Sequence, residues 1–259
     1  MTLLVWTVAN QKGGVGKTTT VVSLAGLLAE RGFRVLLIDT DPHASLTSYL
    51  QYDSDQLPVS LFDLFTEPAE NKAELAQVIL PTEIHNISLI PASMALATLD
   101  RVLGNKEGMG LFLKKQLLLV EDDYDFVLID CPPVLGVMMV NALAACERIL
   151  VPVQTEFLAA KGLERMIKTL QIMQKSRNDH FEYCIIPTMF DKRTRASLNT
   201  LKDLKNSYAN RVWNGVVPVD TKFRDASLKH LPISSHSRNC RGAFAYETLL
   251  NYLLQIEPN

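Results

Sequence analysis

The chain has 259 residues, a formal net charge of −2 and 47% hydrophobic residues. This length can bury a large core, and the near balance of charge excludes a uniformly basic nucleic-acid coat protein. Apolar runs of about 18 residues and a basic leader before a short apolar core are both lacking, which excludes a membrane-spanning helix and a secretory signal. We expect one domain over residues 1–259, located in the cytoplasm.

The first predicted elements are a strand, a glycine-rich loop and a helix. Residues 3–9 are a short apolar run typical of a buried strand, and apolar residues recur with helical spacing over 18–30. The loop between them, residues 12–18, has the sequence K-G-G-V-G-K-T, a variant of the phosphate-binding pattern G-x-x-x-x-G-K-[ST]. Because strand, loop and helix follow in the order that this pattern requires, we expect a nucleotide site here.

The residue types of the loop suit phosphate and magnesium. Glycines without a Cβ let the backbone curl closely and direct successive N–H groups at phosphate oxygens. Lys17 supplies a positive charge, and the Thr18 hydroxyl can coordinate Mg²⁺. The predicted nucleotide-binding residues in the loop are Gly13, Gly14, Val15, Gly16, Lys17, Thr18 and Thr19.

A second lysine stands at the entrance of the loop. One lysine is enough to neutralise the β- and γ-phosphates, and Lys17 already has that role. A side chain at Lys12 points away from its own phosphate cradle and is well placed to meet a nucleotide held by a second subunit. The sequence therefore predicts a nucleotide-dependent homodimer.

Acidic residues follow two later apolar strands. Residues 35–38 lead into Asp39 and Asp41, and residues 126–129 lead into Asp130. Because the carboxyl ends of parallel strands lie at the ligand edge of a sheet, we expect Asp39 and Asp130 near Mg²⁺. Asp41 shares a face with Asp39 and would orient the attacking water.

Strands and helices alternate along most of the chain. Further strands are predicted at 35–39, 87–90, 126–130, 149–153, 183–188 and 215–218, and further helices at 94–103, 110–120, 138–145, 162–176, 195–207 and 241–255. This alternation predicts an α/β P-loop NTPase fold, with a mostly parallel twisted sheet and helices on both faces. The segment 51–82, with short helices near 59–66 and 71–79, is either a partner surface or a plain connection.

The last third of the chain holds a basic cluster and a C-terminal helix without basic residues after its start. Residues 222–241 include Lys222, Arg224, Arg238 and Arg241 against a single acid. This cluster could contact DNA phosphates or form a solvated face near the nucleotide, and both interpretations stay open. Residues 244–259 contain no Lys or Arg, so we expect their apolar stripe to pack on the sheet and not on anionic lipid.

The four cysteines show no metal-binding spacing. They are Cys131, Cys146, Cys184 and Cys240. Three of them lie among apolar residues and are expected to be reduced core thiols.

These motifs together resemble the ParA/MinD family of deviant Walker ATPases, and ParA more closely than MinD. The resemblance covers residues 3 to about 255, in the expected order. It rests on residues 10–19, 39–42, 130–133, 141–143, 151–156, 162–163, 187–191, 217–226 and 241–243.

The resemblance implies a cycle and a set of partners. Two subunits with ATP and Mg²⁺ would close into a sandwich dimer, with Lys12 acting across the dimer and Asp41 carrying the hydrolytic step. Slow hydrolysis, stimulated by an activating or cargo protein, would reopen it. Met189, Pro218 and Asp220 lie in the segments that enclose adenine in this family, and basic residues near Lys222 contact DNA without sequence preference.

The resemblance says less about the cargo and the cellular location than about the nucleotide cycle. Family members position chromosomes, plasmids or large protein assemblies, and residues 39–47 resemble those of relatives that place polar chemotaxis clusters. That subtype implies a nucleoid-associated or polar location. The chain departs from the family at His43, where glutamine is usual, and a solvent-facing histidine without a special role is the expectation there. The chain begins at its first strand, so the N-terminal operator-binding extension of some relatives is not expected.

Two other functions remain open. A metabolic ATP-dependent ligase or amidating enzyme can share this fold, although the sequence shows neither a glutaminase domain nor a Cys–His pair. The other is a scaffold that binds ATP and hardly turns it over.

Overall fold

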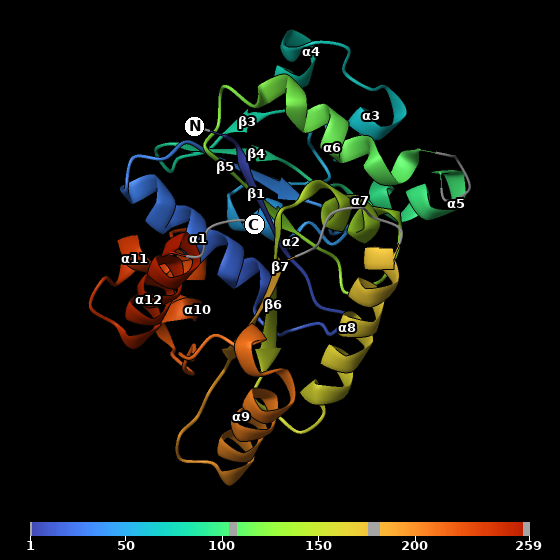
Figure 1. Cartoon of the computed structure of the whole chain (residues 1–259). Coiled ribbons are helices and arrows are strands. Elements are labelled where there is room, and N and C mark those ends of the chain that lie inside the picture. The colour runs from blue at the N-terminus through green and yellow to red at the C-terminus, as the bar shows by residue number, and fades with distance from the viewer. Residues whose placement is uncertain (1, 104–107, 176–181, 256–259) are drawn as a thin grey trace. The chain divides into compact units, whose positions relative to one another are not determined.

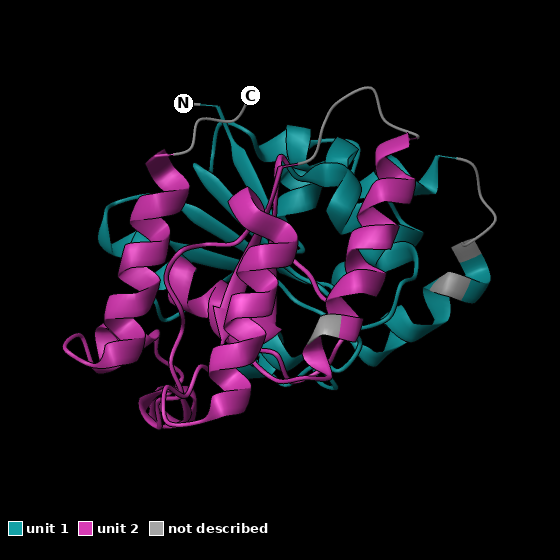
Figure 2. Ribbon diagram, turned by 60° about the horizontal axis from the view of Figure 1, so that its bottom comes forward, with its two compact units in different colours: residues 1–7, 25–146 teal, residues 8–24, 147–259 magenta. Residues whose placement is uncertain are grey.

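The computed structural model describes residues 2–103, 108–175 and 182–255. The chain divides into two compact units, coloured separately in Figure 2. Unit 1 comprises residues 1–7 and 25–146, and unit 2 comprises residues 8–24 and 147–259. The prediction of one domain over 1–259 is not tested by this division.

The fold is an α/β fold with a seven-stranded, mostly parallel sheet, as predicted from the sequence. The strand order is β3-β4-β2-β5-β1-β6-β7, and the short β3 runs antiparallel to β4. The strands are β1 (Leu4–Val8), β2 (Val35–Asp39), β3 (Leu80–Pro81), β4 (Ile87–Ile90), β5 (Phe126–Asp130), β6 (Arg148–Gln154) and β7 (Glu182–Thr188), and Figure 1 labels all of them except β2.

Unit 1 is built on β2 and β5, whose residues are all buried. Phe126 of β5 packs edge-on against Trp6 and Phe33, with ring centroids 5.1 Å apart in both pairs. Aromatic pairs of this geometry add to the burial of apolar area. Its helices are α2 (Ser45–Tyr49), α3 (Leu61–Thr66), α4 (Lys72–Ala76), η1 (Met94–Thr98), α5 (Leu99–Leu103), η2 (Met109–Leu111), α6 (Phe112–Leu117), η3 (Leu118–Val120) and α7 (Val137–Ala145).

Unit 2 combines β6 and β7 with the loop that follows β1 and with the C-terminal helices. The helix α1 (Lys17–Glu30) begins here and continues into unit 1. The C-terminal α12 (Arg241–Gln255) buries a stripe of small and apolar side chains, which confirms that this helix packs within the protein. The remaining helices are α8 (Ala159–Lys175), α9 (Arg195–Tyr208), η4 (Ala209–Arg211), α10 (Lys222–Leu228) and α11 (Ile233–His236), and Figure 1 shows α10, α11 and α12 grouped together.

Three predicted elements differ from the structure. Residues 215–218 were expected to be a strand, but they form only an isolated bridge, from Pro218 to Phe190, and the nearby Val212 forms another with Ile185 of β7. Gly215 and Pro218 explain the difference, because glycine weakens a strand and proline lacks the N–H that a ladder needs. The predicted helices 94–103 and 110–120 are each broken into short 3₁₀ and α segments. The last residue of the predicted helix 162–176 lies outside the described residues.

Three cysteines, Cys131, Cys146 and Cys184, are buried free thiols, as expected, and Cys240 is half-buried. Within the described residues, no helix is both long and apolar enough to cross a membrane.

Candidate functional site

The backbone of the glycine-rich loop in unit 2 takes conformations that need glycine. Gly14 has φ +72° and Gly16 has φ +92°, and a Cβ added at either would meet no atom within 4 Å. The requirement is therefore conformational and not steric, since L-residues with a side chain rarely adopt these angles. This part of the motif fits a loop that curls around an anion.

The carbonyl groups of the loop are held by side chains of the protein. The Lys17 ammonium donates to the Lys12 carbonyl at 3.4 Å, and Lys17 is 9% exposed. Thr188, at the end of β7, donates its hydroxyl proton to the Val15 carbonyl at 2.9 Å. Thr20, in the first turn of α1, donates to the Gly16 carbonyl at 2.8 Å. These bonds fix the carbonyls of the loop, which suits a backbone whose N–H groups receive phosphate.

The entrance of the loop is anchored to β6. The buried Asn10 amide donates to the Pro152 carbonyl at 2.7 Å, and its oxygen accepts from the Lys12 N–H at 3.1 Å. The Lys12 ammonium lies 3.1 Å from the Gln154 amide oxygen and 3.9 Å from a Glu156 carboxylate oxygen. Its side chain is 30% exposed, so Lys12 stays accessible from solvent while Lys17 does not.

The strand-end acids lie in unit 1. Asp39 and Asp130 are register partners at the carboxyl ends of the neighbouring parallel strands β2 and β5, and both are buried. Asp39 accepts hydrogen bonds from the Thr47 N–H and hydroxyl, each at 2.8 Å, and from the Asp41 N–H at 3.1 Å. Burial raises the pKa of Asp39 to about 6, although the hydrogen bonds from Thr47 favour the carboxylate.

This donor set fits Mg²⁺. Carboxylate and hydroxyl oxygens are the hard ligands that Mg²⁺ takes from proteins, usually one or two carboxylates together with substrate phosphates and water. In the described part of the chain, no group of three or more His, Cys, Asp or Glu could hold a metal alone. The acids at Asp39 and Asp130 are thus suited to a metal that arrives with a phosphate ligand.

Asp41 is fixed by its neighbours in the chain. One of its carboxylate oxygens accepts the His43 N–H at 3.0 Å and lies 2.9 Å from Nδ1 of the His43 ring. The His43 side chain is 77% exposed, as expected, but its ring is turned onto Asp41, which the sequence did not predict. The departure at His43 therefore lies beside the residue expected to carry hydrolysis.

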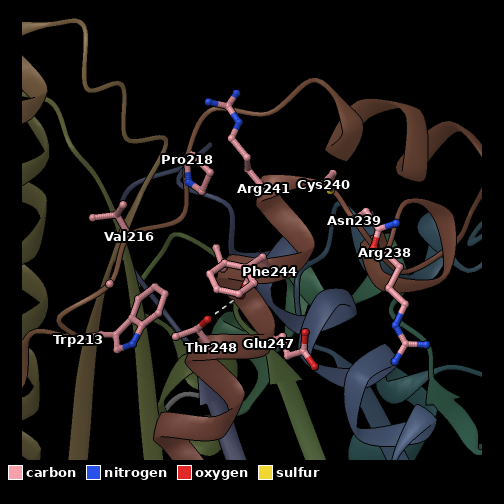
Figure 3. Close-up of a pocket in the computed structure, with 12 residues that line it drawn as sticks. Trp213, Val216, Pro218, Arg238, Asn239, Cys240, Arg241, Phe244, Glu247 and Thr248 are labelled. Atoms are coloured by element: carbon pink, nitrogen blue, oxygen red, sulfur yellow. Dashed lines mark hydrogen bonds between the residues drawn. The ribbon is translucent and has the colours of Figure 1, made fainter.

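The residues expected around adenine are all in unit 2, in different settings. Pro218 lines a pocket of about 690 Å³. Figure 3 shows this pocket with Trp213 and Val216 on one side and Phe244 of α12 on the other. Asp220 does not line it, and its two oxygens accept the N–H groups of Lys222 and Gly242 at 3.0 and 3.1 Å. Met189 follows β7 with φ +51°, an uncommon angle for a residue with a side chain.

The four basic residues expected to contact DNA are exposed but not equivalent. Lys222 pairs with Asp225 at 3.0 Å on α10, and Arg241 donates to the Val219 carbonyl at 3.2 Å. Arg224 is exposed on α10, and Arg238 lines the pocket of Figure 3 together with Arg241.

Sequence reasoning missed the residues that hold the site in place. Thr47 fixes Asp39, Thr188 fixes Val15, and Tyr246 contacts Thr20 through its hydroxyl. A threonine eight residues after a strand-end aspartate is a weak local signal. Tyr246 is 226 residues from its partner, and nothing in the sequence links the two.

Comparisons with known proteins show the family of the chain. Residues 4–183 match the AAA_31 family, described as an AAA domain. The chromosome-partitioning ATPase Soj of Treponema pallidum is 37% identical over 93% of this chain and 92% of its own length. The sporulation initiation inhibitor protein Soj of Bacillus subtilis is 34% identical over 92% of this chain and 93% of its own length.

A solved structure is similar over the same extent. It is described as cobyrinic acid a,c-diamide synthase from Mycobacterium smegmatis, with a bound ATP analogue and magnesium. The sequence identity is 35%, the TM-score is 0.85, and the match covers 98% of this chain and 94% of that one. Since the family match and both Soj relatives extend over most of the chain, it belongs to the ParA/Soj family and is a P-loop ATPase.

Proposed function

We propose that the chain is an ATP-driven switch that partitions or positions a large cargo. The glycine-rich loop would bind the phosphates of ATP, and Thr18, Asp39 and Asp130 would each offer an oxygen ligand to Mg²⁺. ATP closes a homodimer, hydrolysis opens it, and a partner protein accelerates hydrolysis. Transfer of the γ-phosphoryl group needs positioned charge more than a nucleophilic side chain, which matches a site of lysines and acids.

The conformation of the loop carries this proposal. Gly14 and Gly16 adopt positive φ angles, and the carbonyls of Lys12, Val15 and Gly16 are engaged by protein donors. Such a loop before the N-terminus of a helix presents N–H groups to an anion. Buried Lys17 adds the positive charge that the β- and γ-phosphates need.

Replacement of Lys17 tests the nucleotide site. Lys17→Ala removes that charge, and we expect binding of a fluorescent ATP analogue to fall by at least about a hundredfold, since hydrogen bonds to charged groups contribute about 1.5–3 kcal/mol each. Lys202→Ala, an exposed lysine on α9, is the control and should bind normally. ATP affinity that survives Lys17→Ala would refute the loop assignment.

The basic cluster supports a DNA surface for the ATP-bound dimer. Lys222 and Arg224 lie on α10, and Arg238 and Arg241 lie before and at the start of α12. Contacts of this kind go to phosphates, carry no sequence preference and weaken steeply with salt. A dimer would present the cluster twice.

Binding to random-sequence DNA across a salt series tests this surface. We expect binding with ATP and not with ADP. The slope of the logarithm of the binding constant against the logarithm of the salt concentration should be shallower in Arg224→Ala. The change should be about 1 for each phosphate that the variant no longer neutralises. The matched control is Arg34→Ala, since Arg34 is an arginine of unit 1 that pairs with Asp125. A dimer that forms with ATP and ignores DNA would direct the search to a protein surface.

The cargo is a chromosome, a plasmid or a protein assembly, and we favour a polar chemotaxis array. The similarity of residues 39–47 to array-positioning relatives supports this choice. It implies a cytoplasmic protein at the nucleoid or the pole. Imaging of labelled chemoreceptors in cells without the protein tests it, and arrays that stay at the pole would exclude this cargo.

A second function is supported by the solved structure named as a diamide synthase. Amidation would require an amide-nitrogen source, and glutamine-dependent enzymes commonly use an accessible nucleophile such as a thiol. In the described residues, Cys240 is half-buried and the other three thiols are buried. Release of phosphate from ATP without corrinoid or glutamine favours the switch, and turnover that needs both favours amidation.

A further inference from the structure

Tyr246 is a fully buried tyrosine whose hydroxyl reaches the phosphate loop helix. The residue is 1% exposed and lies on α12. Its hydroxyl oxygen is 2.8 Å from the hydroxyl oxygen of Thr20 in α1. Thr20 in turn lies 2.8 Å from the carbonyl oxygen of Gly16. These three groups form a chain from the C-terminal helix to the last glycine of the loop, entirely within unit 2.

The donor and the acceptor in each of these hydrogen bonds follow from the number of hydroxyl protons. A carbonyl oxygen only accepts, so the single hydroxyl proton of Thr20 is donated to Gly16. Thr20 therefore has no proton left for Tyr246, and the Tyr246 hydroxyl must donate to Thr20. Burial raises the pKa of Tyr246, so the phenol stays protonated and keeps this donor role.

The ring of Tyr246 is held by α10. Phe223 packs edge-on against it, with centroids 5.8 Å apart and planes at 88°. Gly242 makes room, because a Cβ there would lie 2.5 Å from the Phe223 ring. Asp220 accepts N–H groups at Lys222 and Gly242, which ties the starts of α10 and α12 together. The ring therefore has little freedom to move its hydroxyl away from Thr20.

We propose that Tyr246 is a positioning residue for ATP hydrolysis, acting through Thr20 on the Gly16 carbonyl. Gly16 stands directly before Lys17 and Thr18, and its φ of +92° sets how the next N–H groups face the phosphates. The bond from Thr20 holds that peptide in orientation, and the bond from Tyr246 holds the Thr20 hydroxyl in the donating rotamer. The inference rests on the proposed role of the loop in binding ATP.

Steady-state ATP hydrolysis by purified variants tests this chain of hydrogen bonds. Tyr246→Phe removes only the hydroxyl, and we expect kcat to fall about fivefold, the value of one hydrogen bond, with a smaller change in KM for MgATP. Thr20→Val should have a similar effect, and Thr20→Ser should restore most of the rate because it keeps the hydroxyl. If Tyr246→Phe does not fold, the Thr20 pair still decides the outcome.

Two comparisons separate positioning from packing. The double variant Tyr246→Phe with Thr20→Val should be no slower than the slower single variant, because both break one chain. Tyr252→Phe, on the same helix beside Arg148 and Glu182, is the control and should hydrolyse ATP normally. Unchanged kcat and KM in folded Tyr246→Phe, or additive losses in the double variant, would overturn the proposal.

The Lys17→Ala variant shows whether a negative result concerns Tyr246 or the proposed ATP site itself. If the loop does not bind ATP, Lys17→Ala hydrolyses ATP at the normal rate. If only the positioning role is wrong, Lys17→Ala is inactive while Tyr246→Phe and Thr20→Val are both unchanged.

Discussion

Asp41 lies in a row of hydrogen bonds that links a buried acid to an exposed histidine. Its N–H donates to Asp39, and its carboxylate accepts from the N–H of His43 and contacts the His43 ring. The carboxylate is thus oriented before any nucleotide arrives. Such prior orientation is what a group needs to align an attacking water.

Replacement of Asp41 should separate binding from hydrolysis. Asp41→Ala removes the group that orients water, so we expect hydrolysis to fall on the order of a hundredfold or more while ATP binding and dimerisation persist. Phosphate release and light scattering measure the two effects. His43→Gln is the matched change next to it, and it should alter the rate by less than about fivefold because an amide can donate to the same oxygen. Normal cycling of Asp41→Ala would show that this residue has another role.

Lys12 differs from Lys17 in exposure and in partners. Lys12 contacts Gln154 and Glu156 of β6 and the segment after it, whereas Lys17 is buried against the loop itself. Exposed ion pairs of this kind contribute about 0–1 kcal/mol, so Lys12 can leave its partners at small cost. It is therefore available to a second subunit.

Replacement of Lys12 should abolish the dimer and spare ATP binding. We expect Lys12→Ala to bind a fluorescent ATP analogue within about twofold of the wild type, because the partly exposed side chain contacts Gln154 and Glu156 and not the loop itself. Analytical ultracentrifugation with ATP should then show only monomer. Lys72→Ala, an exposed lysine paired with Asp123, is the control. A dimer formed by Lys12→Ala with ATP would refute the cross-subunit role.

Among the elements, α12 contributes much of the core of unit 2. Leu249 and Leu250 are 0% exposed, and Leu254, on the same helix, is 37% exposed. Leu250→Ala should lower the free energy of unfolding by about 2–5 kcal/mol, because it removes buried methyl groups and leaves a cavity. Leu254→Ala should cost under about 1 kcal/mol. Urea denaturation measures both, and equal losses would contradict the packing of this helix.

The main elements could be predicted because their signals are local. Apolar runs gave β1, β2 and β4 to β7, and helical spacing gave α1, α7, α8, α9 and α12 to within a few residues. The two-residue β3 and the short α2, α10 and α11 were missed, since a few residues carry no period. Gly215 and Pro218 were counted as part of an apolar strand, and the structure shows why they interrupt one.

The site divides in the same way. The glycine-rich loop and the three acids could be predicted as candidate site residues because their spacing reflects the chemistry directly, and their roles stay predictions. Thr188 and Tyr246 were not, because each depends on which distant segments the fold brings to the loop. The contact of His43 with Asp41 depends on a ring orientation that residue type alone does not give.

At the scale of the whole molecule, we propose that the protein switches between two assembly states. The chain supplies one lysine buried in the glycine-rich loop and one partly exposed at its entrance. We propose that this pair of lysines serves a second subunit that approaches the nucleotide.

The molar mass of the wild-type protein, measured by light scattering with MgATP and with MgADP, tests this claim most directly. Each chain has a mass of 28.9 kDa. We predict twice the mass of one chain with ATP and the mass of a single chain with ADP. The same mass with both nucleotides, in protein shown to bind each of them, would contradict the switch.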